Sequence, residues 1–229
     1  MRTFTQKVAF ALIALMCFAM PQVVMAQDCL VIGEGTDHSS WYLPVANYYH
    51  NCYSQQLFLA DELEMGAAQI TSIAFQYDNY TSSMTRTISV YMANTDATDL
   101  SSAFVTDGLQ EVLSATLFTF DPNDDWSTIE LETPFAYDGS SNLVVAVYMN
   151  YSSSETSYAG GYRFAQTAMT GMARYVSNDT SSPDQIALVN FAPTATGTVQ
   201  SYRCNTQFCY TTGGQSGPVC DKPESLDDT

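Results

Sequence analysis

Basic residues are scarce in this chain. Seven Lys and Arg stand against 24 Asp and Glu, and the formal net charge is −17 at pH 7. Without Arg2 and Lys7, which lie in a segment expected to be cleaved, five basic residues remain against 24 acidic ones, a net charge of −19. A surface of that sign repels phosphate backbones and anionic lipid head groups. We therefore predict no nucleic-acid partner.

Long apolar runs are also missing. The longest, Val8 to Phe18, is too short to span a bilayer. It follows basic residues and precedes Val24-Met25-Ala26, which resembles a signal-peptidase site. We predict a signal peptide over residues 1–26, a secreted or cell-surface location and no membrane insertion. Met16 and Asp28 precede the first two cysteines where a lipobox requires a small residue, which argues against lipidation.

Catalytic motifs are absent from the sequence. Neither G-x-S-x-G nor H-E-x-x-H occurs, and the only histidines are His38 and His50. His38-Ser39-Ser40 contains the parts of a triad, but adjacent residues rarely form one. Glu130 and Glu132 lie two apart on one expected strand face, whereas glycosidases place their carboxylates across a cleft. We predict that the chain is not an enzyme.

Five cysteines remain after the expected cleavage, and export favours disulfides over metal sites or reactive thiols. The disulfide candidates are Cys29, Cys52, Cys204, Cys209 and Cys220. The odd number leaves one cysteine that is free or that pairs outside the segment. The C-x4-C-x10-C spacing at 204–220 has no companion histidine, so it is a weak zinc motif.

Alternating apolar and polar residues predict many short strands separated by Ser-, Asn-, Asp- and Gly-rich turns. Leu143 to Met149 is almost continuously apolar, as in a central strand covered on both faces. Pro134 is expected to end the strand that begins at Trp126, before a turn at Asp138-Gly139. Short helical turns are expected at Asp61 to Met65 and Thr98 to Phe104. The pattern predicts an all-β fold, an antiparallel β-sandwich of jelly-roll type.

Several of these segments together resemble a family of secreted, multidomain adhesin-like proteins of Bacteroidetes, similar to the cleaved-adhesin domains of gingipains and haemagglutinins. The matching segments are Leu43-Pro44 with Tyr48-Tyr49, Ser54 to Ala60, Ile70 to Phe75, Arg86 to Met92, Trp126 to Val145 and Tyr202-Arg203. The resemblance covers residues 40–208 and implies a non-catalytic extracellular domain.

The C-terminal residues change in composition. Cys220-Asp221-Lys222-Pro223 is similar to the Cys-x-x-Pro opening of the fibronectin type III modules that follow such domains. We expect a β-sandwich over 27–210 and, over 211–229, a linker and the start of a truncated second module. Cys220 is expected to pair with Cys204 or Cys209, or with a covalent partner outside the segment.

Two groups of residues are candidate sites. Sugar binding uses aromatic faces beside polar groups, and loops carry function on such scaffolds, so Tyr77, Tyr80, Tyr151 and Tyr158 are candidate ligand-binding residues. The alternative is that these rings only fill half-buried strands, as we expect of Trp126. Asp121, Asp124 and Asp125 are candidate ligands for a structural calcium ion. The alternative there is a solvated acidic turn.

Three functions are compatible with these features. The first is an adhesion or binding domain whose partner is a glycan or a host or matrix protein. The second is a spacer that displays other modules. The third is an accessory domain of an exported protease or glycosidase.

Overall fold

The structure, a computed structural model, describes residues 27–46, 48–78, 82–150, 164–179 and 186–212. One short helix, α2 (Ala60–Leu63), occurs among them. The strands are β1 (Asp28–Ile32), β2 (Asn51–Phe58), β3 (Ala68–Gln76), β4 (Met84–Thr95), β5 (Gln110–Phe120), β6 (Trp126–Tyr137), β7 (Asn142–Asn150), β8 (Gln166–Asn178), β9 (Leu188–Val189), β10 (Ala192–Pro193), β11 (Thr198–Cys204) and β12 (Thr206–Thr211). No helix in the described ranges is long and apolar enough to cross a membrane.

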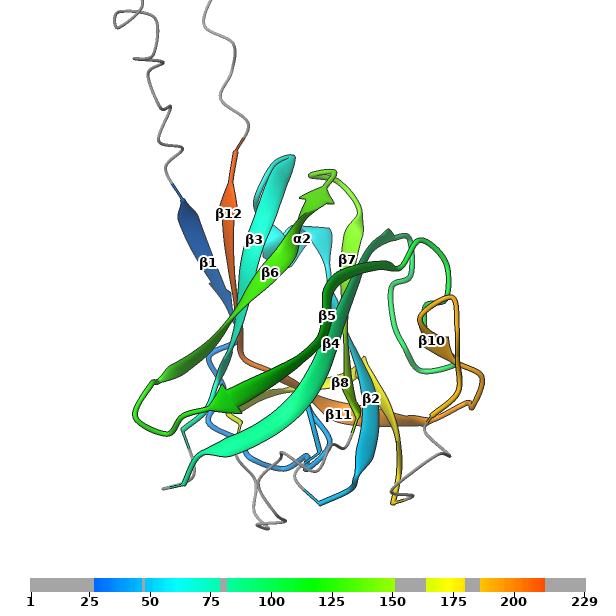
Figure 1. Ribbon diagram of the computed structural model, residues 1–229. Coiled ribbons are helices and arrows are strands. Elements are labelled where there is room, and N and C mark those ends of the chain that lie inside the picture. The colour runs from blue at the N-terminus through cyan, green and yellow to red at the C-terminus, as the bar shows by residue number, and fades with distance from the viewer. Residues whose placement is uncertain (1–26, 47, 79–81, 151–163, 180–185, 213–229) are drawn as a thin grey trace, which may run out of the picture.

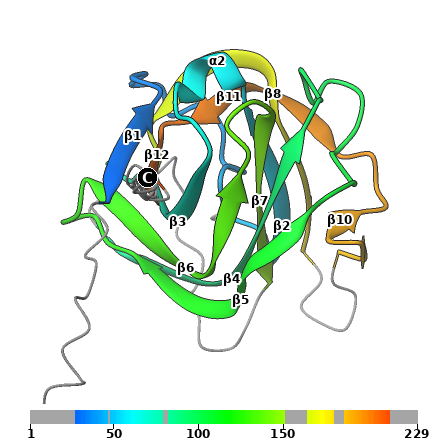
Figure 2. The ribbon, with the colours of Figure 1, turned by 90° about the horizontal axis from the view of Figure 1, so that it is seen from above.

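The strands form two principal antiparallel sheets (Figure 1). One has the order β1-β12-β3-β6 and the other β11-β8-β2-β7-β4-β5. Seen from above, the sheets curve around a common interior (Figure 2), which is filled by apolar side chains of both. The predicted all-β antiparallel sandwich is confirmed.

The central strand β7 is buried on both faces, as its continuous apolar run predicts. Val145 and Val147 point into the core between the sheets. Val144 and Ala146 belong to a second apolar cluster on the other side of the six-stranded sheet. That cluster includes residues of the 100–109 segment and of the β9–β10 hairpin, so these segments cover the outer face.

The segment from Thr98 to Phe104 is not a helix, so that prediction is wrong. Buried polar side chains of the sheet hold it in an extended course instead. The Gln55 amide accepts a hydrogen bond from Val105 N (2.7 Å) and donates one to Val105 O (2.7 Å), as a neighbouring strand would. The Arg174 guanidinium donates to Leu100 O (2.8 Å) and Ser101 O (2.6 Å). These contacts satisfy backbone groups that a helix would otherwise bond internally.

Pro134 does not end β6, which continues to Tyr137. The register between β3 and β6 shifts between Ile70 and Ser72. A bulge of this kind leaves backbone groups outside the ladder, and proline is tolerated there because it has no N–H to donate. The predicted turn follows at Asp138-Gly139, where Gly139 has a φ of 82° and Phe135 is buried.

Asp138 organises this turn with its carboxylate. It accepts hydrogen bonds from the Ser141 hydroxyl (2.6 Å) and from the backbone N–H groups of Ser141 and Ser140 (2.8 Å each). These bonds, the Ser141 hydroxyl first among them, lower the pKa of Asp138 to about 2. The charged carboxylate is therefore part of the turn at neutral pH.

We expect an NMR titration of the Asp138 carboxyl carbon to give a pKa of about 2, below the ordinary 3.8. Because the pKa is lower in the folded chain, the contribution of Asp138 to stability is present above the ordinary value and is lost as the pH falls through about 2. Ser141→Ala removes the hydroxyl donor and should raise the pKa of Asp138. An unshifted wild-type value would contradict this account of the turn.

A disulfide joins the first and last strands. Cys29 on β1 and Cys209 on β12 are partners in the strand register and are bonded to each other across a sequence separation of 180 residues. Cys52 and Cys204 are free and buried. The predicted pairing of Cys220 with Cys209 is wrong because Cys209 is already paired. Cys220 itself lies outside the described residues.

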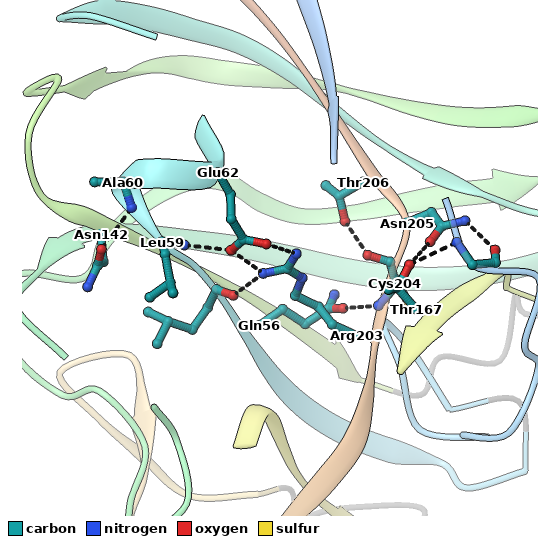
Figure 3. A network of polar contacts seen from close by, with 12 residues as sticks. Gln56, Leu59, Ala60, Glu62, Asn142, Thr167, Arg203, Cys204, Asn205 and Thr206 are labelled. Carbon is teal, nitrogen blue, oxygen red and sulfur yellow. Dashed lines mark hydrogen bonds and ion pairs between the residues drawn. The ribbon is translucent and has the colours of Figure 1, made fainter. Parts of the chain in front are cut away.

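An ion pair between a buried arginine and a partly exposed glutamate ties α2 to β11 (Figure 3). Arg203 is 1% exposed, and its guanidinium donates two hydrogen bonds to the Glu62 carboxylate at 2.9 and 2.7 Å. It also donates to Leu57 O (2.7 Å) and lies 4.4 Å from the centre of the Phe58 ring. Glu62 in turn accepts a hydrogen bond from Leu59 N (2.9 Å) at the start of α2. Arg203 thus connects three elements through one side chain.

Candidate functional site

Aromatic side chains meet in a continuous row beside the start of β2 and the end of β8. The ring centroids are 6.1 Å apart for Trp41 and Tyr48, 5.2 Å for Tyr48 and Tyr49, and 5.7 Å for Tyr49 and Tyr42. The Tyr42 ring stacks on Tyr175 of β8 at 3.7 Å. Tyr48 is 44% exposed and the other four are partly exposed. We call these five residues the aromatic surface.

The segment before β2 is anchored by the residues between the exposed rings. Leu43 and Val45 are buried in the core. Two side chains of β2 bind the backbone of the same segment: the Ser54 hydroxyl donates to Pro44 O (2.6 Å), and the Cys52 thiol donates to Tyr42 O (3.5 Å). Burial raises the pKa of the Cys52 thiol to about 12, so this donor keeps its proton at neutral pH. The apolar centre of the segment points inward and its aromatic flanks stay at the surface.

Gln166 fixes the start of this segment. Its amide is buried, accepts hydrogen bonds from Ser39 N (3.1 Å) and Ser40 N (2.9 Å), and donates one to Ser40 O (2.9 Å). The backbone of Gln166 also pairs with that of Asp37. Hydrogen bonds to Gln166 therefore fix the chain immediately before Trp41, although this segment is not part of a strand. A site fixed in this way loses little conformational entropy when a ligand binds.

The tyrosine hydroxyls of the aromatic surface interact with one another. Burial, followed by a hydrogen bond with Tyr175, raises the pKa of Tyr42 above its ordinary value. The hydrogen bond with Tyr42 raises the pKa of Tyr49. These two phenols stay neutral at physiological pH and can exchange hydrogen bonds with a ligand.

Polar groups lie next to these rings. His50 follows Tyr49, and its Nδ1 hydrogen-bonds to Asp179 O (2.9 Å) and lies 3.3 Å from the Asp179 carboxylate. Asn51 Nδ2 donates to Asn178 Oδ1 (2.9 Å), which joins the start of β2 to the end of β8. The result is a row of partly exposed rings with an imidazole and a carboxylate group beside it.

Tyr77 is the one predicted ligand-binding tyrosine among the described residues, and it is not part of this surface. Tyr77 is fully buried and its hydroxyl donates to Ser82 O (2.8 Å), so its ring cannot meet a ligand from solution. It packs instead against Phe120 and Phe164 in the core, and the prediction for Tyr77 is corrected. Tyr80, Tyr151 and Tyr158 lie outside the described residues.

The predicted calcium ligands lie in the turn between β5 and β6. Asp121 Oδ1 accepts hydrogen bonds from Asn123 N (2.9 Å) and Asn123 Nδ2 (2.7 Å), which makes it a turn-forming residue. No three His, Cys, Asp or Glu side chains in the described part of the chain are grouped so that they could hold a metal ion. Calcium also takes backbone carbonyls and water as ligands, so the calcium site at Asp121, Asp124 and Asp125 stays a prediction. Trp126, expected in the core, is only half-buried.

The histidine and serines at 38–40 are held apart by other partners. His38 Nε2 lies 2.5 Å from Asp78 Oδ1. The Ser40 hydroxyl donates to the Gln200 side chain (2.7 Å). The His38 imidazole and the Ser40 hydroxyl therefore bind different side chains, Asp78 and Gln200, and no hydrogen bond joins them to each other.

One signal for the aromatic surface was present in the sequence. Trp41-Tyr42 and Tyr48-Tyr49-His50 bracket a short apolar stretch with a proline just before β2. A Pro-containing segment that precedes a strand and carries four aromatics at its ends is a candidate binding loop. The fifth ring, Tyr175, comes from β8, and only the strand order brings it to Tyr42.

No protein-family model matches the chain, and no curated protein matches it either. The resemblance to adhesin-like domains stays a prediction. What the chain does must be inferred from its surface chemistry.

Proposed function

We propose that the chain is an exported, non-catalytic binding domain that takes a neutral glycan on the aromatic surface. The observation that carries this proposal is the ring-to-ring contact from Trp41 through Tyr48, Tyr49 and Tyr42 to Tyr175. Sugar rings have C–H faces that pack on aromatic faces and hydroxyl rims that need polar partners. Aromatic residues bury large areas at little conformational cost when they are already held in place.

The glycan class follows from charge. The chain has a formal net charge of −17, and Asp179 lies beside the rings. Sialylated and sulfated glycans carry negative charges that such a surface repels. A neutral oligosaccharide avoids that cost and can use the Tyr42 and Tyr49 hydroxyls for hydrogen bonds.

Export is supported by two independent features. The first 26 residues have the composition of a signal peptide. The Cys29–Cys209 disulfide is of the kind that persists outside the reducing cytosol. A secreted or surface-exposed location would bring the domain to glycans of a host, a matrix or the diet. A spacer domain has no need of a preorganised aromatic surface.

We expect the purified chain to bind selected neutral oligosaccharides on a glycan array, and Tyr48→Ala to weaken that binding by about tenfold or more, as loss of a central aromatic anchor does. Tyr48 is 44% exposed, so its truncation should leave the fold intact. Leu117→Ala is the matched control, because Leu117 is 52% exposed on β5 and is not part of the aromatic surface. Equal binding by both variants, or an array without any neutral hit, would contradict the proposal.

A further inference from the structure

The rings of the aromatic surface do not share one plane. The plane of Tyr48 is inclined by 47° to that of Trp41 and by 62° to that of Tyr49. The plane of Tyr42, in contrast, lies within 29° of Tyr49 and within 10° of Tyr175. The surface therefore has two parts. One is a stack of roughly parallel tyrosine rings, and the other is Tyr48, which is turned away from both of its neighbours in the row.

The stack has polar groups to offer a ligand more than ring faces. The centroids of Tyr42 and Tyr175 are 3.7 Å apart with nearly parallel planes, so each ring covers one face of the other. The Tyr42 hydroxyl forms hydrogen bonds with those of Tyr175 and Tyr49, so the three hydroxyls lie together. A phenol can donate one hydrogen bond and accept two, so this cluster has more capacity than its internal bonds use. The stack is therefore suited to the hydroxyl rim of a sugar.

Tyr48 is suited to the other side of a sugar, its C–H face. It is 44% exposed, the most exposed of the five rings. A sugar that packs on the face of an aromatic ring lies parallel to that ring. A sugar on Tyr48 is then inclined by 62° to the plane of Tyr49, the nearest ring of the stack. The next sugar of the chain must turn if it is to meet the stack as well.

Flat glycans cannot use both parts. In a β-1,4-linked glucose chain the successive sugar rings lie in one flat ribbon, and crystalline cellulose presents flat faces built of such ribbons. A flat face contacts several aromatic rings only where those rings are coplanar and side by side. The angles of 47° and 62° at Tyr48 exclude that arrangement. Tyr42 and Tyr175 are parallel, but they lie face to face and so add no second coplanar ring.

We propose that the aromatic surface selects a soluble glycan chain whose successive sugar rings turn, as they do in α-1,4-linked chains, over a flat β-1,4-linked chain. This inference rests on the proposed function and adds the linkage to it. One sugar packs on Tyr48, and the next presents its hydroxyls to Tyr42 and Tyr49. Specificity arises because a flat chain satisfies only one of the two parts at a time.

The test compares maltotetraose with cellotetraose, which contain the same glucose units and differ only in linkage. Each is titrated into the chain and followed by the indole N–H signal of Trp41 in a 15N NMR spectrum. We expect maltotetraose to bind about tenfold more tightly, the difference that one lost contact makes. Equal affinities, tighter binding of cellotetraose or retention of the chain on crystalline cellulose would overturn the inference.

Failure of the linkage inference can be told apart from failure of the proposed function. If neither tetraose binds, the inference is overturned, whereas a neutral hit on the glycan array leaves the proposed function standing. If the array has no neutral hit either, both are overturned.

A variant tests whether Tyr48 sets the preference. Tyr48→Ala removes the turned ring and should bring the two tetraoses to within about twofold of each other, because only the stack then remains. Leu117→Ala, on β5, should keep the preference of the wild type. A preference that survives in Tyr48→Ala would contradict the role of this ring. Unchanged unfolding midpoints establish that both variants fold.

Discussion

Replacing Arg203 with methionine is expected to lower the free energy of unfolding by about 3–5 kcal/mol. The substitution keeps an apolar stem in the core but removes the guanidinium that binds Glu62 and Leu57 O. The Glu62 carboxylate, whose side chain is 24% exposed, then loses its cation, and Leu57 O loses a donor. Equilibrium unfolding in guanidinium chloride measures the effect directly.

The control for this prediction removes the carboxylate as well. The double variant Arg203→Met with Glu62→Leu should be more stable than Arg203→Met alone, since it no longer contains the Glu62 carboxylate without its cation. Burial alone would raise the pKa of Glu62, but the hydrogen bonds from Arg203 and Leu59 N outweigh it and hold the pKa below its ordinary value. The pair should therefore stabilise the wild type above the ordinary pKa of Glu and lose its effect as the pH falls through the lowered value. A single variant that costs less than about 1 kcal/mol would contradict this account.

Loss of the Cys29–Cys209 disulfide is expected to cost about 4 kcal/mol, because it closes a loop of 180 residues and so restricts the unfolded chain strongly. The variant is Cys29→Ser with Cys209→Ser. Both residues belong to the β1–β12 pair at the edge of the sheet, where β12 is the only strand paired with β1 among the described residues. We therefore expect β1 to separate first, and hydrogen exchange on β1 should rise more than on β7.

Reductant supplies the control for the disulfide. It should destabilise the wild type to the level of the double variant and leave the double variant unchanged. Burial raises the pKa values of both the Cys52 and the Cys204 thiol, to about 12 for Cys52, so neither thiol is reactive in the folded chain. An effect of reductant on the wild type that falls short of the double variant would contradict the Cys29–Cys209 pairing. A further loss of stability in the double variant on reduction would contradict the free state of Cys52 and Cys204.

Much of the sheet structure could be predicted from local pattern. The apolar residues alternate in β3 and β4, where one face of the strand points into the core between the sheets, and run continuously in β7, where both faces are buried. Successive side chains of a strand point to opposite faces, so the sequence pattern shows directly which faces are buried. The end of β6 could not be predicted in this way. Pro134 is tolerated because of a register shift opposite Ile70, and register depends on the partner strand.

The candidate sites were harder to predict for the same reason. Tyr77 and Tyr48 look alike in sequence, but one is fully buried and the other 44% exposed. The difference arises from contacts distant in sequence: Phe164 and Phe120 cover Tyr77, whereas Tyr48 follows a segment anchored by Leu43 and Val45. The low number of basic residues was visible at once, but the burial of Arg174 and Arg203 was not. Only the strand order reveals that these charges are enclosed.

The most direct test of the central claim uses the two tryptophans of the chain, Trp41 and Trp126. Their indole N–H groups give two separate signals in a 15N NMR spectrum, one from the aromatic surface and one from the start of β6. On titration with a neutral oligosaccharide selected from the array, the Trp41 signal should shift in proportion to occupancy while the Trp126 signal stays in place. If the Trp41 signal is unchanged at saturation, or if only the Trp126 signal moves, the aromatic surface is not the glycan site.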